Sequence, residues 1–159
     1  MFSRDIGIDL GTANVVIHVK GRGIVLDEPS VVAIDKATGK IHAVGTEAHL
    51  MVGRTPGNIV AIRPLQDGVI ADFEMTEAML RHFIDKIEVR KMFGGVRMLI
   101  CTPASITTVE AKAIRQAGEK SGAKTVFLEV EPKVAAVGAG MDIWMPAGHM
   151  VIDIGGGTT

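Results

Sequence analysis

Two aspartates in this sequence each precede a turn that contains glycine, and they lie near opposite ends of the chain. Asp9 follows an apolar run and comes two residues before Gly11, and Asp153 follows another apolar run and precedes three consecutive glycines at 155–157. Such a turn leaves several backbone N–H groups pointing one way, which makes a concave site for an anion. An aspartate repels phosphate, but it can hold a divalent cation beside phosphates, directly or through water.

Each motif alone also fits an ordinary β-hairpin with a glycine in its turn. The repetition of apolar strand, aspartate and glycine turn near both termini favours two half-sites that close on one nucleotide from opposite sides. Neither motif is a Walker A loop, which requires Gly-Lys-Ser or Gly-Lys-Thr after the glycines, or a dinucleotide fingerprint with three spaced glycines. The sequence therefore predicts a phosphate-binding site of a type different from these two common loops.

The elements that must position these motifs change character along the chain. Short apolar runs separated by turn residues predict a β-meander of about five strands over residues 5–44 and a short helix over 47–52. Helical periodicity then alternates with continuous apolar runs, which indicates an α/β sheet with helices on its faces. The expected later elements are a helix over 76–90 with Thr76 as N-cap, a strand over 96–102, a helix over 107–121 opened by a Thr107–Glu110 capping box, a strand over 125–130, a helix from 131 and a strand over 149–154.

The two motifs resemble the phosphate loops of the superfamily that contains actin, heat-shock proteins and sugar kinases. Within it, the stretches 5–14, 58–64 and 67–73 resemble the bacterial actin MreB, the rod shape-determining protein family. The stretch 131–141 is most similar to the MreB-like paralogue Mbl of Gram-positive bacteria. Because proteins of this family are much longer than this chain, the resemblance implies an N-terminal half that stops inside the second phosphate loop.

The resemblance also implies the architecture. The expected fold is the actin-like ATPase fold of the ribonuclease H-like type, an α/β fold with a mixed β-sheet flanked by helices and a small α+β subdomain. Subdomain IA is expected over residues 1–33 and 67–145, and subdomain IB over 34–66. Residues 146–159 would be the start of subdomain IIA, with the chain truncated after the first strand of the second lobe.

Site roles follow from the same resemblance. It implies that Asp9 and Asp153 hold a hydrated Mg²⁺ from opposite sides, and that Glu131 orients or deprotonates the water that attacks the γ-phosphate of ATP. From the sequence alone, Glu131 also fits a surface acid that stabilises a helix N-terminus. The family segments that contact adenosine lie beyond residue 159, so the chain alone is expected to be inactive as an ATPase. The residues expected to contact phosphate are Gly11, Thr12, Ala13 and Asn14 in the first loop, and Gly155, Gly156, Gly157 and Thr158 in the second.

Two large apolar residues, Met92 and Phe93, follow Arg90 and Lys91 where the sequence predicts a loop. In one interpretation they fold back onto the domain. In the other they enter a membrane surface while the two cations meet anionic lipid headgroups. The resemblance favours membrane contact, because proteins of this family bind the membrane through a hydrophobic loop at this place.

Composition excludes several other classes of function. The net charge of −1 gives no indication of nucleic-acid binding. The single cysteine, Cys101, excludes a disulfide framework and suits a reducing cytoplasm, where its apolar neighbours predict a buried core residue. No signal peptide is expected, because Arg4 and Asp5 follow the start at once, and no apolar run approaches the roughly 20 residues that span a bilayer.

Three functions remain open at the level of the sequence. The resemblance implies a bacterial actin that forms ATP-dependent, membrane-associated filaments on the cytoplasmic face of the inner membrane, where it organises cell-wall elongation and so determines rod shape. Its implied partners are further copies of itself, the membrane surface and the peptidoglycan-synthesising elongation machinery. The first alternative is a phosphotransferase of the sugar- or acetate-kinase type, which would need a polar substrate-binding insertion. The second is a natural truncated module that caps filaments without turnover.

Overall fold

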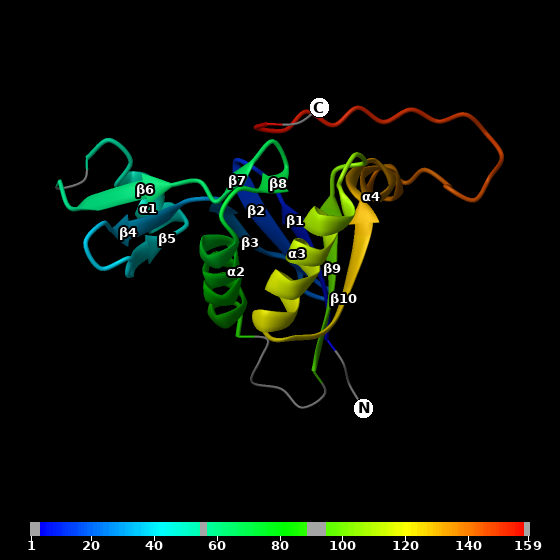
Figure 1. Ribbon diagram of the computed structural model, residues 1–159. Coiled ribbons are helices and arrows are strands. Elements are labelled where there is room, and N and C mark those ends of the chain that lie inside the picture. Colours follow the sequence, from blue (N-terminus) through cyan, green and yellow to red (C-terminus); the bar gives the residue numbers. More distant parts are fainter. Residues whose placement is uncertain (1–3, 55–56, 89–94, 158–159) are drawn as a thin grey trace.

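The computed structural model describes residues 4–54, 57–88 and 95–157, and these form three sheets and four helices (Figure 1). The strands are β1 (Arg4–Leu10), β2 (Asn14–Val19), β3 (Gly23–Pro29), β4 (Val32–Asp35), β5 (Ile41–Val44), β6 (Ile59–Ile62), β7 (Leu65–Gln66), β8 (Val69–Ile70), β9 (Val96–Thr102) and β10 (Ala123–Val130). The helices are α1 (Thr46–Leu50), α2 (Phe73–Lys86), α3 (Thr108–Lys120) and α4 (Glu131–Gly138).

The main sheet has five strands in the order β10-β9-β1-β2-β3. β1 pairs antiparallel with β2, and β2 with β3, because short turns join them. β9 lies parallel to both β1 and β10, and the helix α3 makes the crossover from β9 to β10. The sheet is therefore mixed and flanked by helices, as predicted.

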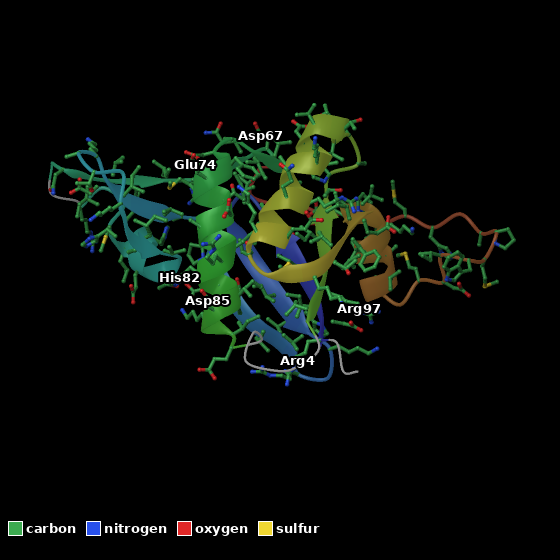
Figure 2. All side chains as sticks on the ribbon, turned by 60° about the horizontal axis from the view of Figure 1, so that its bottom comes forward. Arg4, Asp67, Glu74, His82, Asp85 and Arg97 are labelled. Carbon is green, nitrogen blue, oxygen red and sulfur yellow. The ribbon has the colours of Figure 1, made fainter. Side chains whose placement is uncertain are left out.

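The main core lies between the sheet and the helices α2 and α3, which lie side by side over one of its faces (Figure 1). Alternate residues of β1 are buried because successive side chains of a strand point to opposite faces. The polar side chains along α2 that are exposed include Glu74, His82 and Asp85 (Figure 2). The largest fully buried side chains include Ile8, Ile17, Met79, Leu80, Phe83, Ile84, Met98, Ile100 and Ile114.

The five strands predicted over residues 5–44 are present as β1 to β5, but they do not form one meander, because the chain leaves the main sheet after β3. β4 pairs with β5 and β6 in a separate three-stranded sheet, which together with α1 forms what we call the small unit. Val31 and Ala33 are buried in a cluster within that unit, whereas Val32 between them joins the main core. Strand alternation thus gives β4 two cores to fill. The boundaries of subdomains IA, IB and IIA stay a prediction.

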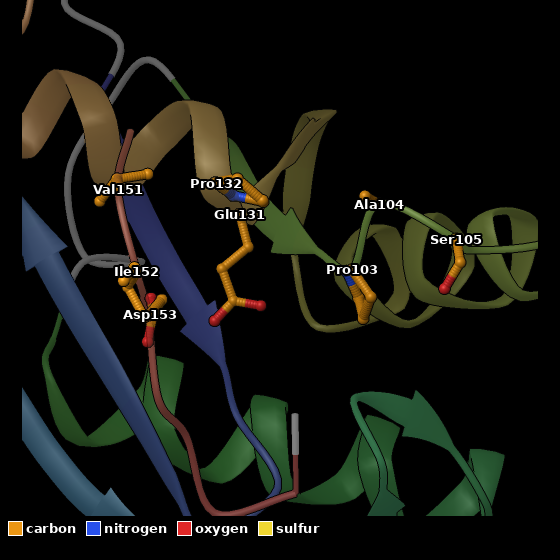
Figure 3. A pocket seen from close by; sticks show the side chains of 8 residues that line it. All are labelled: Pro103, Ala104, Ser105, Glu131, Pro132, Val151, Ile152 and Asp153. Atoms are coloured by element: carbon orange, nitrogen blue, oxygen red, sulfur yellow. The ribbon is translucent and has the colours of Figure 1, made fainter. Parts of the chain in front are cut away.

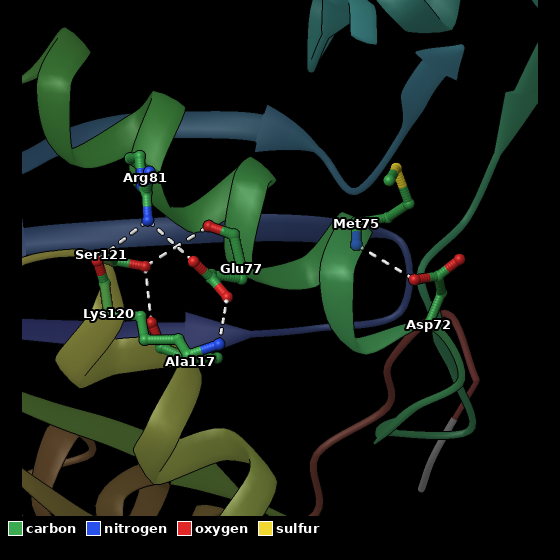
Figure 4. Close-up of polar contacts among 7 residues, drawn as sticks. All are labelled: Asp72, Met75, Glu77, Arg81, Ala117, Lys120 and Ser121. Atoms are coloured by element: carbon green, nitrogen blue, oxygen red, sulfur yellow. Dashed lines mark hydrogen bonds and ion pairs between the residues drawn. The ribbon is translucent and has the colours of Figure 1, made fainter. Parts of the chain in front are cut away.

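The start of α2 differs from the expectation. Asp72 is the N-cap, accepting a hydrogen bond from the Met75 N–H at 3.0 Å (Figure 4). The predicted cap, Thr76, lies inside the helix. Thr76 is fully buried, and its hydroxyl donates to the Asp72 carbonyl at 2.7 Å. The threonine therefore satisfies its hydroxyl within the first turn, and the aspartate is free to cap the helix.

The capping box of Thr107 and Glu110 at the start of α3 is confirmed. Two polar contacts link the long helices: Glu77 of α2 accepts from Lys120 of α3 at 3.1 Å, and Arg81 of α2 donates to the Lys120 carbonyl at 3.3 Å (Figure 4). Arg81 also donates to Glu77 within α2, at 2.8 Å. These exposed contacts add little stability, and the buried apolar side chains that α2 and α3 share hold the two helices together.

The C-terminal segment, residues 139–157, leaves α4, loops away from the sheet and returns above the turn between β1 and β2 (Figure 1). The predicted strand over 149–154 is not formed, because within the described residues this segment pairs with no other strand, and a strand needs a ladder partner. Its apolar side chains are consequently open to solvent: Trp144 is 87%, Met150 79% and Ile154 78% exposed.

Candidate functional site

Three parallel strands end together at the edge of the sheet where the predicted site residues gather. Ile8 of β1 pairs with Ile100 of β9, which in turn pairs with Leu128 of β10, so the carboxyl ends of these strands are level. Asp9 belongs to the end of β1, and Glu131 begins α4 directly after β10. Ligand sites of α/β sheets collect at this edge, and the two acids separated widely in sequence meet there for that reason.

The first predicted phosphate loop is the turn at residues 11–13 between β1 and β2. It is tight: a Cβ built on Gly11 would lie 2.7 Å from the carbonyl oxygen of Asn14. The Thr12 hydroxyl oxygen accepts a hydrogen bond from the Gly68 N–H at 2.9 Å. Glycine is therefore required at position 11 by lack of space, and the threonine is held by a segment far from it in sequence.

The second predicted loop lies directly against the first. A Cβ on Gly156 would stand 2.5 Å from the Cβ of Ala13, and one on Gly157 would stand 2.9 Å from the hydroxyl oxygen of Thr12. Both glycines thus permit an approach that any side chain would prevent. The structure brings the two motifs from opposite ends of the sequence into contact.

Three carboxylates near these loops, those of Asp9, Asp153 and Glu131, are close enough to interact electrostatically with one another. Partial burial and then the charge of Asp153 raise the pKa of Asp9, which still keeps access to solvent. Burial and then the charges of Asp9 and Asp153 raise the pKa of Glu131. Figure 3 shows the carboxyl groups of Glu131 and Asp153 projecting into the same space beside the end of β1. The site therefore concentrates negative charge that a bound cation would relieve.

Cys101, at the end of β9, is affected by the same carboxylates. Burial and then the charges of Asp9, Glu131, Asp153 and Glu129 raise the pKa of its thiol to about 12, so the thiol stays protonated at neutral pH. The side chain is half-buried and packs at the end of β9. Its chemistry is that of a small, unreactive residue in a negative environment.

The donor set fits a hydrated cation better than a closed metal cage. Among the residues that the structure describes, no group of three or more His, Cys, Asp or Glu side chains is placed to hold a metal ion by itself. Mg²⁺ commonly keeps several waters and takes only one or two carboxylates plus phosphate oxygens. Asp9 and Asp153, coupled electrostatically across the two loops, offer that arrangement.

A pocket of about 420 Å³ opens beside the acids, in the size range of small-molecule sites (Figure 3). Sequence reasoning missed its wall at 103–105, although the position of this loop directly after a strand at the carboxyl edge is a usable signal. The residues that line it are Pro103, Ala104, Ser105, Glu131, Pro132, Val151, Ile152 and Asp153.

The remaining predicted site residues lie at the margins of the two loops or outside the described residues. Asn14 is at the start of β2, where its amide group donates to the Asp27 carboxylate at 2.9 Å. Gly155 lies in the C-terminal segment next to the two glycines that contact the first loop. Thr158, Met92 and Phe93 lie outside the described residues. None of the helices built from the described residues combines the length and apolarity needed to cross a membrane.

Comparison with known proteins gives a consistent result. Residues 3–159 match the family model described as MreB/Mbl protein. The chain is 74% identical to the cell shape-determining protein Mbl of Bacillus cereus, and the match covers all of this chain and 48% of that protein. It is 56% identical to the cell shape-determining protein MreB of Escherichia coli K12, covering all of this chain and 47% of that one. The chain therefore spans about half the length of these relatives.

Solved structures agree with the sequence relatives. MreB5 of Spiroplasma citri bound to ADP matches with a TM-score of 0.86 and 40% identity, covering 96% of this chain and 45% of that one. The MamK double helical filament matches with a TM-score of 0.75 at 23% identity, covering 87% of this chain and 44% of that one, which shows the shared fold alone. The predicted actin-like fold is confirmed.

Proposed function

The chain belongs to the MreB/Mbl protein family, and from this we propose that it supplies the phosphate-binding half of a bacterial actin that forms ATP-dependent filaments. The observation that carries the proposal is the contact of the two glycine loops, Gly156 on Ala13 and Gly157 on Thr12, beside three carboxylates. MreB structures of a relative bound to ADP and to AMPPNP support a nucleotide as the ligand.

In the proposed mechanism the chain holds the phosphates and activates water. Amides of the first loop and of the glycines in the second would hold the phosphate oxygens, and Asp9 and Asp153 would hold Mg²⁺ beside them. Bound Mg²⁺ supplies charge neutralisation for the transferring phosphoryl group. Glu131, whose raised pKa makes it a stronger base than an ordinary glutamate, accepts a proton from the attacking water or orients it.

We further propose a cytoplasmic location at the inner face of the cell membrane. The apolar pair Met92 and Phe93, beside Arg90 and Lys91, would contact lipid, and filament avidity would strengthen an otherwise weak loop. The relatives are named cell shape-determining proteins, which supports a role in rod shape through the cell-wall elongation machinery.

A chimera tests the proposal. Residues 1–159 would replace the matching half of Mbl from Bacillus subtilis, to which they are 73% identical. We expect the chimera to sediment in the presence of ATP and to release phosphate without any added sugar or acetate. Parental Mbl is the reference for both measurements. The isolated chain is expected to release none. Loss of both sedimentation and nucleotide binding in a folded chimera would contradict the proposal, and inhibition of Mbl by traces of the isolated chain would support the capping module instead.

A further inference from the structure

The carbonyl groups of the first loop are all held from outside it, by two residues to which the sequence assigned no role at the site. The buried Ser30 donates its hydroxyl to the Gly11 carbonyl at 2.6 Å and its N–H to the Ala13 carbonyl at 2.8 Å. Arg63 donates one guanidinium nitrogen to the carbonyls of Thr12 and Ala13, at 3.3 and 3.4 Å. Because both donors share the Ala13 carbonyl, they lie on the same side of the turn.

This arrangement determines where the amides of the loop point. In a trans peptide the C=O and the next N–H point in opposite directions. Fixing the carbonyls of Gly11, Thr12 and Ala13 on one side therefore turns the N–H groups of Thr12, Ala13 and Asn14 to the other. Within the described part of the chain, the N–H groups of Thr12 and Ala13 donate to no protein acceptor. A row of such amides is a nest for an anion.

Both supports stand at the junctions between the main sheet and the small unit. Ser30 lies between β3 and β4, where the chain enters the small unit, and Arg63 lies directly after β6, where it leaves. A third contact comes from the same region: the Gly68 N–H donates to the Thr12 hydroxyl oxygen. Because that oxygen accepts, the hydroxyl proton of Thr12 remains available for donation to a ligand.

We propose that Ser30 and Arg63 are positioning residues for phosphate binding, which act through the first loop and do not touch the ligand. The ligand class is a polyphosphate chain, and this inference rests on the proposed function. Preformed amides bind an anion without paying to reorient peptide groups. Each support is worth one or two hydrogen bonds, so removing either lowers phosphate affinity by about 10-fold.

The test uses the full 159-residue chain labelled with ¹⁵N and ¹³C, titrated with inorganic tripolyphosphate and Mg²⁺. In the wild type we expect the N–H signals of Thr12, Ala13 and Asn14 to shift on titration. Ser30→Ala and Arg63→Ala should each bind about 10-fold more weakly, and Arg63→Lys, which keeps a charged donor, should bind more tightly than Arg63→Ala.

A spectroscopic signature separates positioning from general damage. Before any ligand is added, Ser30→Ala should move the carbonyl ¹³C signal of Gly11, and Arg63→Ala that of Thr12. The control Arg22→Ala removes the same charge at the far end of β2 and should leave both the affinity and these signals unchanged. Unchanged affinity in both alanine variants, or a wild type whose loop amides ignore tripolyphosphate, overturns the inference.

The proposed function can fail separately. A chimera that neither sediments nor turns over ATP would overturn it, while tripolyphosphate binding that depends on Ser30 and Arg63 would still uphold the positioning role. If the chimera is active and its Ser30→Ala and Arg63→Ala variants bind nucleotide with normal affinity, only the positioning role is overturned.

Discussion

Gly157 lies directly against Thr12: a Cβ on the glycine would stand 2.9 Å from the threonine hydroxyl oxygen and 3.0 Å from its methyl carbon. These residues belong to motifs at opposite ends of the chain, and their contact makes one surface from two loops. Real Cβ atoms do not approach neighbours so closely, so this surface depends on glycine in the second loop. The predictions below follow from that geometry and from the charges around it.

Gly156→Ala should separate the two loops, because the new Cβ would lie 2.5 Å from the Cβ of Ala13. In the chimera with Mbl we expect nucleotide affinity to fall by about 10-fold. The Tm should change by less than about 1 °C, since the segment around Gly156 is exposed. The matched control is Gly148→Ala, where a Cβ meets nothing within 4 Å. Equal affinity in the two variants would contradict the prediction.

Glu131→Gln should separate chemistry from binding. It removes the proposed proton acceptor while keeping the shape of the side chain, so ATP turnover by the chimera should fall by about 10²–10⁴-fold. Nucleotide affinity should stay within about twofold, measured with a fluorescent nucleotide. Glu129→Gln is the control, because Glu129 pairs with Lys133 at 2.6 Å and has no assigned role in turnover. Turnover that survives Glu131→Gln would remove that residue from the mechanism.

Asp9→Asn should stabilise the metal-free chain at neutral pH. Because the folded-state pKa of Asp9 is raised, the folded protein binds this proton more tightly than the unfolded chain, and stability is lost as pH rises through that pKa. The substitution should therefore raise the Tm at pH 7 by roughly 1–3 °C and by less near pH 4. Mg²⁺ should raise the wild-type Tm at pH 7 and leave that of Asp9→Asn unchanged. A gain in Tm that is larger near pH 4 than at pH 7 would contradict the prediction, because it would mean that the folded protein does not raise the pKa of Asp9.

Glu28→Gln should loosen the small unit. The carboxylate of Glu28, on β3, accepts from the N–H and hydroxyl of Thr46, both at 2.7 Å, and from Lys86 of α2. Burial alone would raise its pKa, but the bonds from Lys86 and Thr46 outweigh burial and lower it. We expect a loss of about 1–3 kcal/mol in the free energy of unfolding at pH 7.

The sign of the pH dependence of Glu28 follows from its lowered pKa. Its stabilising contribution is complete above the ordinary glutamate pKa of about 4.3 and is lost as pH falls through the folded-state value. The difference between wild type and Glu28→Gln in urea unfolding should therefore shrink in acid. Exposed Glu119→Gln serves as the control and should cost less than about 0.5 kcal/mol at either pH.

Met92→Ser combined with Phe93→Ser should abolish sedimentation of the polymerised chimera with anionic liposomes. The physical reason is that two large apolar side chains provide the buried area that a cationic loop needs to enter the interface. Met92→Leu with Phe93→Leu preserves that area and should bind as the wild type does. Undiminished liposome binding by the serine pair would place the membrane contact elsewhere or remove it.

Local chemistry in the sequence was enough for much of the fold. The glycine motifs after Asp9 and Asp153, the Thr107–Glu110 capping box and the continuous run of β9 each act within a few residues, so they are readable without tertiary contacts. They predicted the α/β class, and the resemblance of the stretches 5–14, 58–64, 67–73 and 131–141 to known proteins predicted the family; both are confirmed. The N-cap of α2 was assigned wrongly to Thr76, since Asp72 and Thr76 both suit a cap and only the folded chain shows which one is buried.

The sequence by itself determined which residue types could bind phosphate and a cation, because each motif needs only its own spacing. The tertiary structure alone decided which groups meet: the level carboxyl ends of β1, β9 and β10 bring Asp9 and Glu131 to one edge, and hydrogen bonds across the fold place Ser30 and Arg63 behind the first loop. It also split the expected meander and left residues 149–154 without a partner strand. Strand pairing and burial depend on contacts between distant segments, and no local pattern in the sequence specifies those contacts.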